Sequence, residues 1–249
     1  MGRIEQNTDM ANVADTAVVT GSSSGIGLAL SRMLVKNGYE VFGFGRNFER
    51  AEAQEFCKEQ PEKFHAVVCD ITDTQVLCAH IKEIDKNYRV TVLVNNAGVG
   101  YYGLHEELNP KKIQKMVRTN LEAPMILTQQ LLRTLKKNRG TVLNISSVTA
   151  AQSNPHGCAY GATKAGLSGF AKSLFDEVRK YGVRVITIQP DMAKTDLYRN
   201  ADFCEGEEEA SYLLPEEVAE AAAFALAQRE GLVVTEITVK PQFHRIRRK

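Results

Sequence analysis

Tyr160 and Lys164 stand four positions apart in the segment Tyr-Gly-Ala-Thr-Lys, within a stretch expected to be helical. Residues four apart share a helix face, so the lysine ammonium can approach the tyrosine ring. A nearby cation favours the phenolate and makes the phenol a better acid, which suits general acid and base catalysis. Ser147, thirteen positions earlier, supplies a hydroxyl that can bind a carbonyl or alcohol oxygen. The tyrosine–lysine pair alone also occurs on solvated helix faces, so it needs support from other residues.

A glycine-rich loop early in the chain provides that support. Residues 16–20 predict a short strand, and an apolar helix follows through about residue 34. The loop between them contains Gly21, Ser23, Ser24, Gly25, Ile26 and Gly27. Glycines permit a tight turn and close backbone approach, while the free amides at a helix start bind an anion. The spacing also fits a simple turn, but its place directly after the first strand favours a dinucleotide pyrophosphate.

Strand-like apolar runs alternate with amphipathic helical ones along the rest of the chain. Further strands are expected near residues 40–45, 64–68, 91–95, 141–145, 184–189 and 232–239. This alternation predicts a single α/β domain with a doubly wound, seven-stranded parallel sheet and helices on both faces. Ligands in such sheets bind beyond the carboxyl ends of the strands, where each of these motifs falls.

The composition excludes several classes of protein. The chain has 249 residues and 43% hydrophobic content, enough for one large core. Its 31 basic and 30 acidic residues nearly cancel, so no nucleic-acid or membrane partner is expected. No apolar run approaches the roughly 20 residues that a membrane span needs. His65, His80 and His105 lack metal-ligand spacing, and no metal is expected.

Two further features bear on location and order. The five cysteines are odd in number, widely spaced and without a C-x-x-C pair, which indicates reduced thiols in a cytoplasmic protein. Residues 1–15 are polar and carry acids, unlike a signal peptide, and we expect them to form a loosely ordered lead to a domain spanning 16–249.

Residues 20–27, Asn95-Asn96-Ala97-Gly98, Asn120, Ser147 and the Tyr160–Lys164 pair occur in an order and spacing that resemble the short-chain dehydrogenases/reductases, over nearly the whole chain. The resemblance implies a Rossmann-like fold and a catalytic set of Asn120, Ser147, Tyr160 and Lys164. In it, Lys164 also holds the nicotinamide ribose beside Tyr160, and Asn120 holds a water that links the lysine to solvent. Asn96 and Gly98 approach the cofactor. A local helix irregularity is the alternative explanation for Asn120.

The second expected strand bears on nucleotide preference. Where a carboxylate for the adenosine ribose is usual, this chain has Gly45 followed by Arg46. A guanidinium binds a 2′-phosphate and no carboxylate repels it, so NADP(H) is the expected cofactor. By the resemblance, Asp70 accepts a hydrogen bond from the adenine amino group. The alternative is that Asp70 is only a turn residue ahead of a helix. Arg50 either assists Arg46 or begins a solvated helix.

The resemblance breaks after the sixth expected strand. Pro190 matches the family, but Asp191 stands where glycine is usual; Thr195 again matches the position that binds the nicotinamide carboxamide. A carboxylate there would repel anionic substrates unless Lys194 compensates it. The alternative is that Asp191 faces solvent or caps the next short helix. Residues 192–214 are expected to form a variable lid over the substrate.

The C-terminal residues and the oligomeric state are harder to assign. The chain ends in several basic residues, which either meet an acidic neighbour or phosphate or form a solvated tail. By resemblance, we expect a homodimer or homotetramer joined through residues 110–137 and 156–181.

These features predict an enzyme that interconverts a small-molecule carbonyl and an alcohol with NADP(H), using tyrosine as general acid and base. Two alternatives are a carrier-protein-linked 3-oxoacyl reductase and a non-catalytic NADP(H)-binding sensor. The acidic residues 205–209 argue against an acidic carrier, and the intact catalytic set argues against a sensor.

Overall fold

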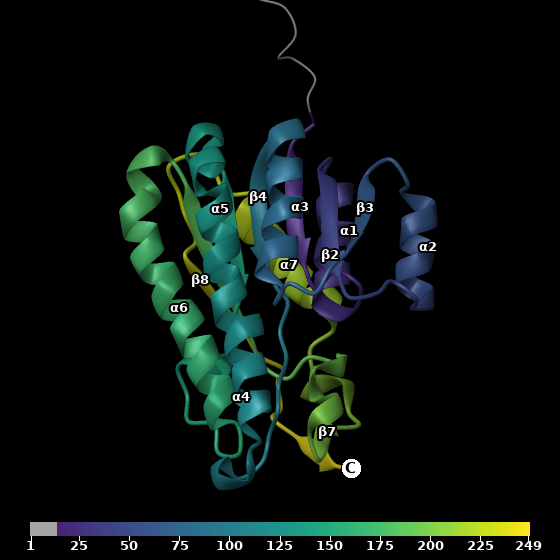
Figure 1. The fold of residues 1–249 in the computed structure, drawn as a ribbon. Helices are drawn as coiled ribbons and strands as arrows, with labels where there is room; N and C mark the ends of the chain where they lie inside the picture. The colour runs from purple at the N-terminus through teal and green to yellow at the C-terminus, as the bar shows by residue number, and fades with distance from the viewer. Residues whose placement is uncertain (1–13) are drawn as a thin grey trace, which may run out of the picture.

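The computed structural model describes residues 14–249 and contains a seven-stranded, wholly parallel sheet with the order β3-β2-β1-β4-β5-β6-β8 (Figure 1). Its strands are β1 (Thr16–Thr20), β2 (Glu40–Gly45), β3 (Phe64–Val68), β4 (Val90–Asn95), β5 (Thr141–Ile145), β6 (Arg184–Pro190) and β8 (Glu236–Val239). The predicted doubly wound α/β domain is confirmed. Of the predicted loose lead, residues 1–13 lie outside the described part of the chain.

One strand differs from its prediction. The last strand of the main sheet begins at Glu236 rather than near residue 232, because β8 pairs with β6 only from Thr187 onward. Arg184, at the start of β6, has no strand partner on this side, and its side chain donates to the carbonyl of Leu226 at 2.8 Å. Residues 232–235 are therefore loop.

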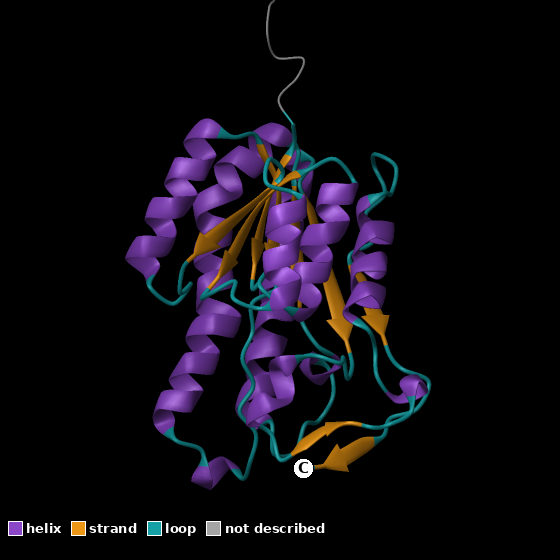
Figure 2. Cartoon of the chain, turned by 90° about the vertical axis from the view of Figure 1, so that its right-hand side faces the viewer, coloured by secondary structure: helices purple, strands orange, loops and turns teal. Residues whose placement is uncertain are grey.

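Helices cover both faces of the sheet (Figures 1 and 2). They are α1 (Gly25–Lys36), α2 (Ala51–Glu59), α3 (Thr74–Asn87), α4 (Pro110–Val117), α5 (Ala123–Asn138), α6 (Cys158–Val178) and α7 (Pro215–Leu226). Alternate residues of β1 point to opposite sides: Ala17 and Val19 pack with α1 and α7, whereas Val18 packs with α3, α5 and α6. Burial on both faces explains the continuous apolar runs of the strands. Within residues 14–249, no helix is both long and apolar enough to cross a membrane.

A smaller unit lies beyond the carboxyl ends of the strands (Figure 2). After β6 the chain forms a short helix (Asp196–Asn200), the strand β7 (Phe203–Glu205) and another short helix (Glu209–Ser211). The C-terminal strand β9 (Ile246–Arg248) pairs antiparallel with β7. The basic tail is exposed, as expected of a solvated tail, but it also folds against the acidic segment of its own chain.

Candidate active site

One cavity at the carboxyl ends of the strands brings together fifteen of the sixteen residues predicted for the site. They are Gly21, Ser23, Ser24, Gly25, Ile26, Gly27, Arg46, Asp70, Asn96, Gly98, Ser147, Tyr160, Lys164, Pro190 and Thr195. Asn120 does not line the cavity. The parallel sheet explains this gathering, because segments far apart in sequence end at the same edge.

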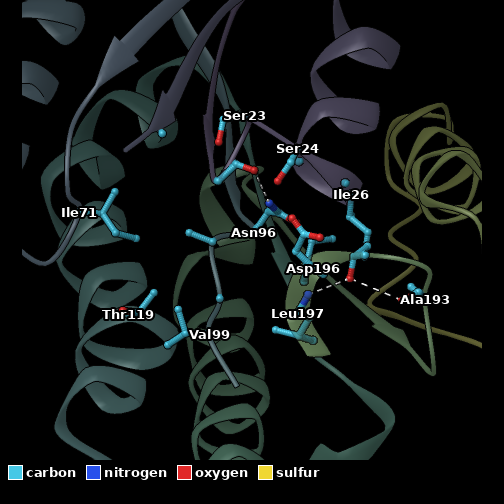
Figure 3. A pocket seen from close by; sticks show the side chains of 18 of the residues that line it. Ser23, Ser24, Ile26, Ile71, Asn96, Val99, Thr119, Ala193, Asp196 and Leu197 are labelled. Atoms are coloured by element: carbon cyan, nitrogen blue, oxygen red, sulfur yellow. Dashed lines mark hydrogen bonds between the residues drawn. The ribbon is translucent and has the colours of Figure 1, made fainter. Parts of the chain in front are cut away.

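The phosphate loop leaves the start of α1 open toward the cavity (Figure 3). Ser24 is the N-cap residue, yet its side chain makes no capping hydrogen bond, and the first turn carries no acidic residue. A Cβ on Gly27 would lie 2.1 Å from the carbonyl oxygen of Gly21, so the loop closes on itself only because that residue is glycine. Gly25 has φ +51° and lies against Thr195 across the cavity. Free amides, a positive helix end and close backbone fit a pyrophosphate.

Two asparagines fix the neighbouring strand ends. The Asn96 amide donates to the carbonyl of Thr20 at 2.8 Å, and the Asn95 amide donates to the Asn144 side chain at 2.9 Å. These bonds tie β4 to β1 on one side and to β5 on the other. The loop after β4 is thereby held close to the phosphate loop.

The far end of the cavity carries positive charge. Arg46, which follows Gly45, and Lys115 of α4 both line it, and both act on Asp70. Burial raises the pKa of Asp70, but hydrogen bonds from Thr72 and the charges of Arg46 and Lys115 outweigh burial and lower it below its usual value. The Asp70 carboxylate accepts from the backbone N–H and the hydroxyl of Thr72 through one oxygen. This arrangement fits both the turn residue and the adenine contact that the sequence suggested.

Tyr160, Lys164 and Ser147 meet at the other end, and all three are buried. The Lys164 ammonium donates to the carbonyl of Ile145 at 2.7 Å and lies 5.8 Å from the centre of the Tyr160 ring. Burial lowers the pKa of Lys164 to about 8. Burial raises the pKa of Tyr160, and a hydrogen bond with Ser147 opposes this. The pKa of Tyr160 is thus governed by its burial and opposed by Ser147, and the effect of Lys164 on its acidity stays a prediction.

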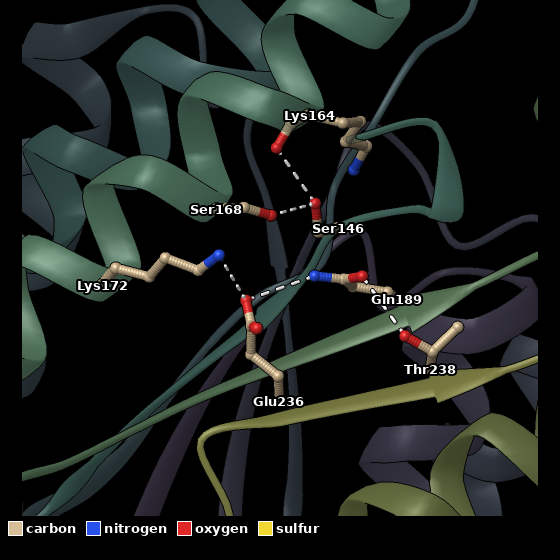
Figure 4. A network of polar contacts seen from close by, with 7 residues as sticks. All are labelled: Ser146, Lys164, Ser168, Lys172, Gln189, Glu236 and Thr238. Atoms are coloured by element: carbon tan, nitrogen blue, oxygen red, sulfur yellow. Dashed lines mark hydrogen bonds and ion pairs between the residues drawn. The ribbon is translucent and has the colours of Figure 1, made fainter. Parts of the chain in front are cut away.

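The register of α6 on the sheet depends on Ser146 (Figure 4). Its hydroxyl donates to the carbonyl of Lys164 at 3.0 Å and shares a 2.8 Å hydrogen bond with Ser168. Close by, Lys172 of α6 pairs with Glu236 of β8 at 3.3 Å. Ser146 therefore bonds to the helix, while its neighbour Ser147 bonds to the phenol of Tyr160.

Asn120 lies behind the cavity wall in a π-helical turn, Arg118–Glu122, that separates α4 from α5. The single long helix predicted from residue 110 is thus interrupted, as the alternative interpretation of Asn120 proposed. Its amide accepts from the backbone N–H of Val99 and donates to the Val99 carbonyl, each at 2.9 Å. A Cβ at Gly98 would lie 3.6 Å from the Lys164 ammonium and 3.7 Å from Asn120 Oδ1. Asn120 therefore holds the loop that covers the lysine.

An aromatic wall covers Tyr160, and the sequence analysis missed its central member. Tyr102 lies 5.7 Å from the Tyr160 ring, 6.1 Å from Tyr198 and 5.1 Å from Phe203, measured between ring centres. Burial raises the pKa of Tyr102, which keeps it a neutral phenol. The signal available in sequence was its position, four residues past Gly98 in the loop after β4.

Asp191 lines the cavity with a side chain that is 15% exposed. Its carboxylate accepts from the backbone of Met192 at 2.9 Å and lies 3.9 Å from His244 of the C-terminal tail. Thr195, not Asp191, caps the next short helix. Lys194 points away, with its ammonium 5.0 Å from the centre of the Tyr212 ring. The carboxylate is therefore neither fully solvated nor neutralised by Lys194.

Arg50, at the start of α2, forms an ion pair with Asp196 at the start of the segment beyond β6. Asp196 lines the cavity, so this contact joins its two sides near the phosphate loop. His156 and Cys158, which precede Tyr160 in sequence, are exposed and do not line the cavity.

Comparisons with known proteins agree with this geometry. Residues 15–203 match the family model described as short chain dehydrogenase. The chain is 37% identical over 186 residues to serine 3-dehydrogenase of Agrobacterium fabrum, covering 74% of each protein. It is 34% identical over 233 residues to a 3-oxoacyl-[acyl-carrier-protein] reductase of Rickettsia conorii, covering 90% of this chain and 93% of the relative.

A solved structure, the alcohol dehydrogenase of Thermococcus sibiricus complexed with 5-hydroxy-NADP, superposes with a TM-score of 0.83 at 27% identity, covering 93% of this chain and 98% of the other. With the sheet order and the gathered motifs, these similarities establish that the chain belongs to the short-chain dehydrogenase/reductase family of oxidoreductases.

Proposed function

We propose that the protein interconverts a carbonyl and an alcohol by hydride transfer with NADP(H), and that Tyr160 is its general acid and base. The observation that supports this is the placement of Tyr160, Ser147 and Lys164 on the same cavity as an open phosphate loop. When bound, NADP(H) supplies or accepts the hydride. Residues 21–27 would hold its pyrophosphate, and Thr195 and Pro190 would contact its nicotinamide.

The chain's own residues supply the proton. In the reducing direction, the Ser147 hydroxyl orients the carbonyl oxygen and Tyr160 gives that oxygen its proton. Because burial raises the pKa of Tyr160, the tyrosine is protonated at neutral pH, as reduction requires. Lys164 is a cation below about pH 8 and stabilises the phenolate that remains. Asn120 would hold the water that returns a proton by way of Lys164.

The preference for NADP(H) rests on Arg46. It lines the end of the cavity opposite Tyr160, and the preceding residue is Gly45 instead of an acid. Lys115 adds a second cation at this end. A 2′-phosphate there would meet two positive charges, so its binding is favoured over that of an unmodified ribose. The Thermococcus sibiricus enzyme, whose structure carries an NADP derivative, has the same fold.

The substrate end favours a small neutral or amino-bearing compound over an anionic one. Asp191 presents a carboxylate to the cavity, Lys194 does not pair with it, and Tyr198 lines the cavity near Tyr160 and its neighbouring ring Tyr102. Aromatic faces with a nearby carboxylate attract ammonium groups. Serine, named in the activity of the Agrobacterium relative, is an amino-bearing alcohol that also carries a carboxylate, so it supports the amino-bearing class but not the exclusion of anions. A carrier-linked 3-oxoacyl substrate is the second candidate, because the Rickettsia relative aligns over most of both chains.

The test is consumption of NADPH and NADH by the purified protein against neutral, amino-bearing, acidic and carrier-linked carbonyls. We expect turnover with NADPH and preference for neutral or amino-bearing compounds. Asp191→Gly should shift the ratio of amino-bearing to anionic turnover about fivefold toward anions, which corresponds to about 1 kcal/mol. Glu230→Gln, at an exposed pair far from the cavity, is the control. Unchanged selectivity in Asp191→Gly would refute the substrate assignment, and preference for the carrier-linked compound would favour the second candidate.

A further inference from the structure

The C-terminal residues 243–249 run along the segment that follows β6 (Figure 2). Three backbone hydrogen bonds extend the pairing of β9 with β7. Gly206 donates to Arg245 at 3.0 Å, Lys249 donates to Asp202 at 2.8 Å, and Phe243 donates to Ala210 at 3.0 Å. We call residues 243–249 the strap and keep the name lid for residues 192–214. Strap and lid therefore form one sheet that stands apart from the main one.

Opposite charges face each other along this contact. Arg247 pairs with Glu207 at 3.3 Å, and Arg245 pairs with Glu208. The Lys249 ammonium donates to the carbonyl of Tyr198 at 2.6 Å. These charged side chains are more than half exposed where their exposure is known, so each pair is individually weak and sensitive to salt. The backbone pairing sets the geometry, while the charges select the acidic lid as the strap's partner.

The lid carries two aromatic rings that pack against Tyr102, the ring beside Tyr160. Tyr198 and Phe203 contact each other, with ring centres 5.5 Å apart, and both contact Tyr102. Phe203 lies directly opposite Arg248 in the strand pairing. The strap is thus bonded to the backbone of Tyr198, which lines the cavity, and paired with Phe203, which packs behind it against Tyr102.

The base of the lid is held in a different way. The backbone N–H of Lys194 donates to Leu213 and that of Leu213 donates to Met192, each at 2.8 Å. The Arg50–Asp196 ion pair holds the start of the lid beside the phosphate loop. Thr195, the expected nicotinamide contact, lies within this base. Loss of the strap should therefore free the aromatic wall and leave the cofactor end in place.

We propose that the strap is a positioning element for the substrate end: it holds the lid so that Tyr198 and Phe203 close over the substrate beside Tyr160. The expected change in KM rests on the proposed function, whereas the expected loosening of the lid does not. His244 of the strap lies 3.9 Å from Asp191 at the cavity, whereas Arg245 and Arg247 pair with Glu208 and Glu207 of the lid. Their loss should raise the KM of the carbonyl substrate, with a smaller effect on kcat and none on NADPH affinity.

The test uses the full chain with any affinity tag at the N-terminus. Arg245→Glu/Arg247→Glu places acid against acid, and adding Glu207→Arg/Glu208→Arg restores opposite charges in reverse. Arg179→Glu, which disrupts an exposed ion pair between Arg179 and Asp176 far from the site, is the matched control. The readouts are trypsin cleavage after Arg199 and hydrogen exchange over residues 196–209, followed by KM, kcat and the NADPH Kd.

We expect the double arginine variant to be cut at Arg199 at least about fivefold faster, with KM raised about fivefold or more, and both effects reversed in the four-residue swap. A truncation after residue 242 should show the same loss of protection. Unchanged cleavage, exchange and KM in the double variant would overturn the proposal. Faster cleavage and exchange without turnover in any variant would support the strap and refute the proposed function, so the two failures are distinguishable.

Discussion

The two ends of the cavity are built by different means. The cofactor end consists of buried strand ends and glycine backbone, where a Cβ at Gly27 would overlap the carbonyl of Gly21. The substrate end consists of a lid with exposed charges that is held by the last residues of the chain. The family model stops at residue 203, inside β7. Backbone geometry therefore builds the end with the phosphate loop, whereas side chains on a separately held segment build the end beside Tyr160.

Tyr160 lies between the two ends, and its replacement should have the largest effect. Tyr160→Phe removes the proton donor but leaves the phosphate loop untouched, so turnover should fall about 10²- to 10⁴-fold. The NADPH Kd should stay within about twofold, since the phenol is remote from the phosphates. Steady-state kinetics and fluorescence titration of NADPH measure both. Tyr181→Phe, at an exposed tyrosine, is the control. Turnover within tenfold of the wild type would remove Tyr160 from the mechanism.

A substitution in the phosphate loop should damage the cofactor end alone. Gly27→Ala forces the loop away from Gly21, at a cost of about 1–3 kcal/mol typical of overpacking. The NADPH Kd should rise about tenfold or more, and the unfolding midpoint should fall. Gly169→Ala is the matched control, because a Cβ there meets no atom within 4 Å and alanine stabilises a helix by up to about 1 kcal/mol. Equal NADPH affinity in both variants would contradict the assigned role of the loop.

Replacement of the buried Lys164 should raise the free energy of unfolding. Its pKa in the folded protein, about 8, lies below its unfolded value, so the unfolded chain binds more protons between these values and the lysine destabilises the fold most below pH 8. Lys164→Met should stabilise the protein by about 1–2 kcal/mol at pH 7, less than the full burial penalty because the Ile145 carbonyl loses its donor. The gain should shrink as pH rises from 8 toward 10, and turnover should collapse. Urea unfolding at pH 7 and 9.5 measures this; a destabilised variant at pH 7 would refute the account of Lys164.

Arg46 tests cofactor choice with a smaller effect. Arg46→Ala removes a guanidinium that would bind the 2′-phosphate, and the kcat/KM for NADPH should fall about tenfold, equivalent to about 1.4 kcal/mol at this exposed position. The kcat/KM for NADH should change less than twofold. Arg139→Ala, a similarly exposed arginine far from the cavity, is the control. An equal loss with both cofactors would argue against selection of NADP(H) by Arg46.

Sequence reasoning succeeded where local pattern and backbone chemistry decide the structure. The buried apolar runs of β1, β4 and β5 have no alternative to a covered parallel sheet, and the glycine loop can form only where glycine fits. The motifs that follow those strands also predicted fifteen residues that line one cavity.

It failed where contacts between distant short segments decide. The pairing of β7 with β9 joins three-residue strands about forty positions apart, and strands of that length carry no periodic signal. Tyr102 belongs to the aromatic wall only because Tyr198 and Phe203 fold over it. The pKa of Tyr160 depends on how completely water is excluded, which spacing alone does not reveal.

The most direct test of the central claim follows the hydride itself. Wild-type protein is mixed with NADPH that carries deuterium at the nicotinamide C4 position, on each face in turn, and with a carbonyl that turns over in the panel. The account predicts one alcohol formed per NADPH consumed, with deuterium on the carbinol carbon from one face only. Tight NADPH binding with no deuterium transfer to any carbonyl of the panel would contradict it and leave a sensing role.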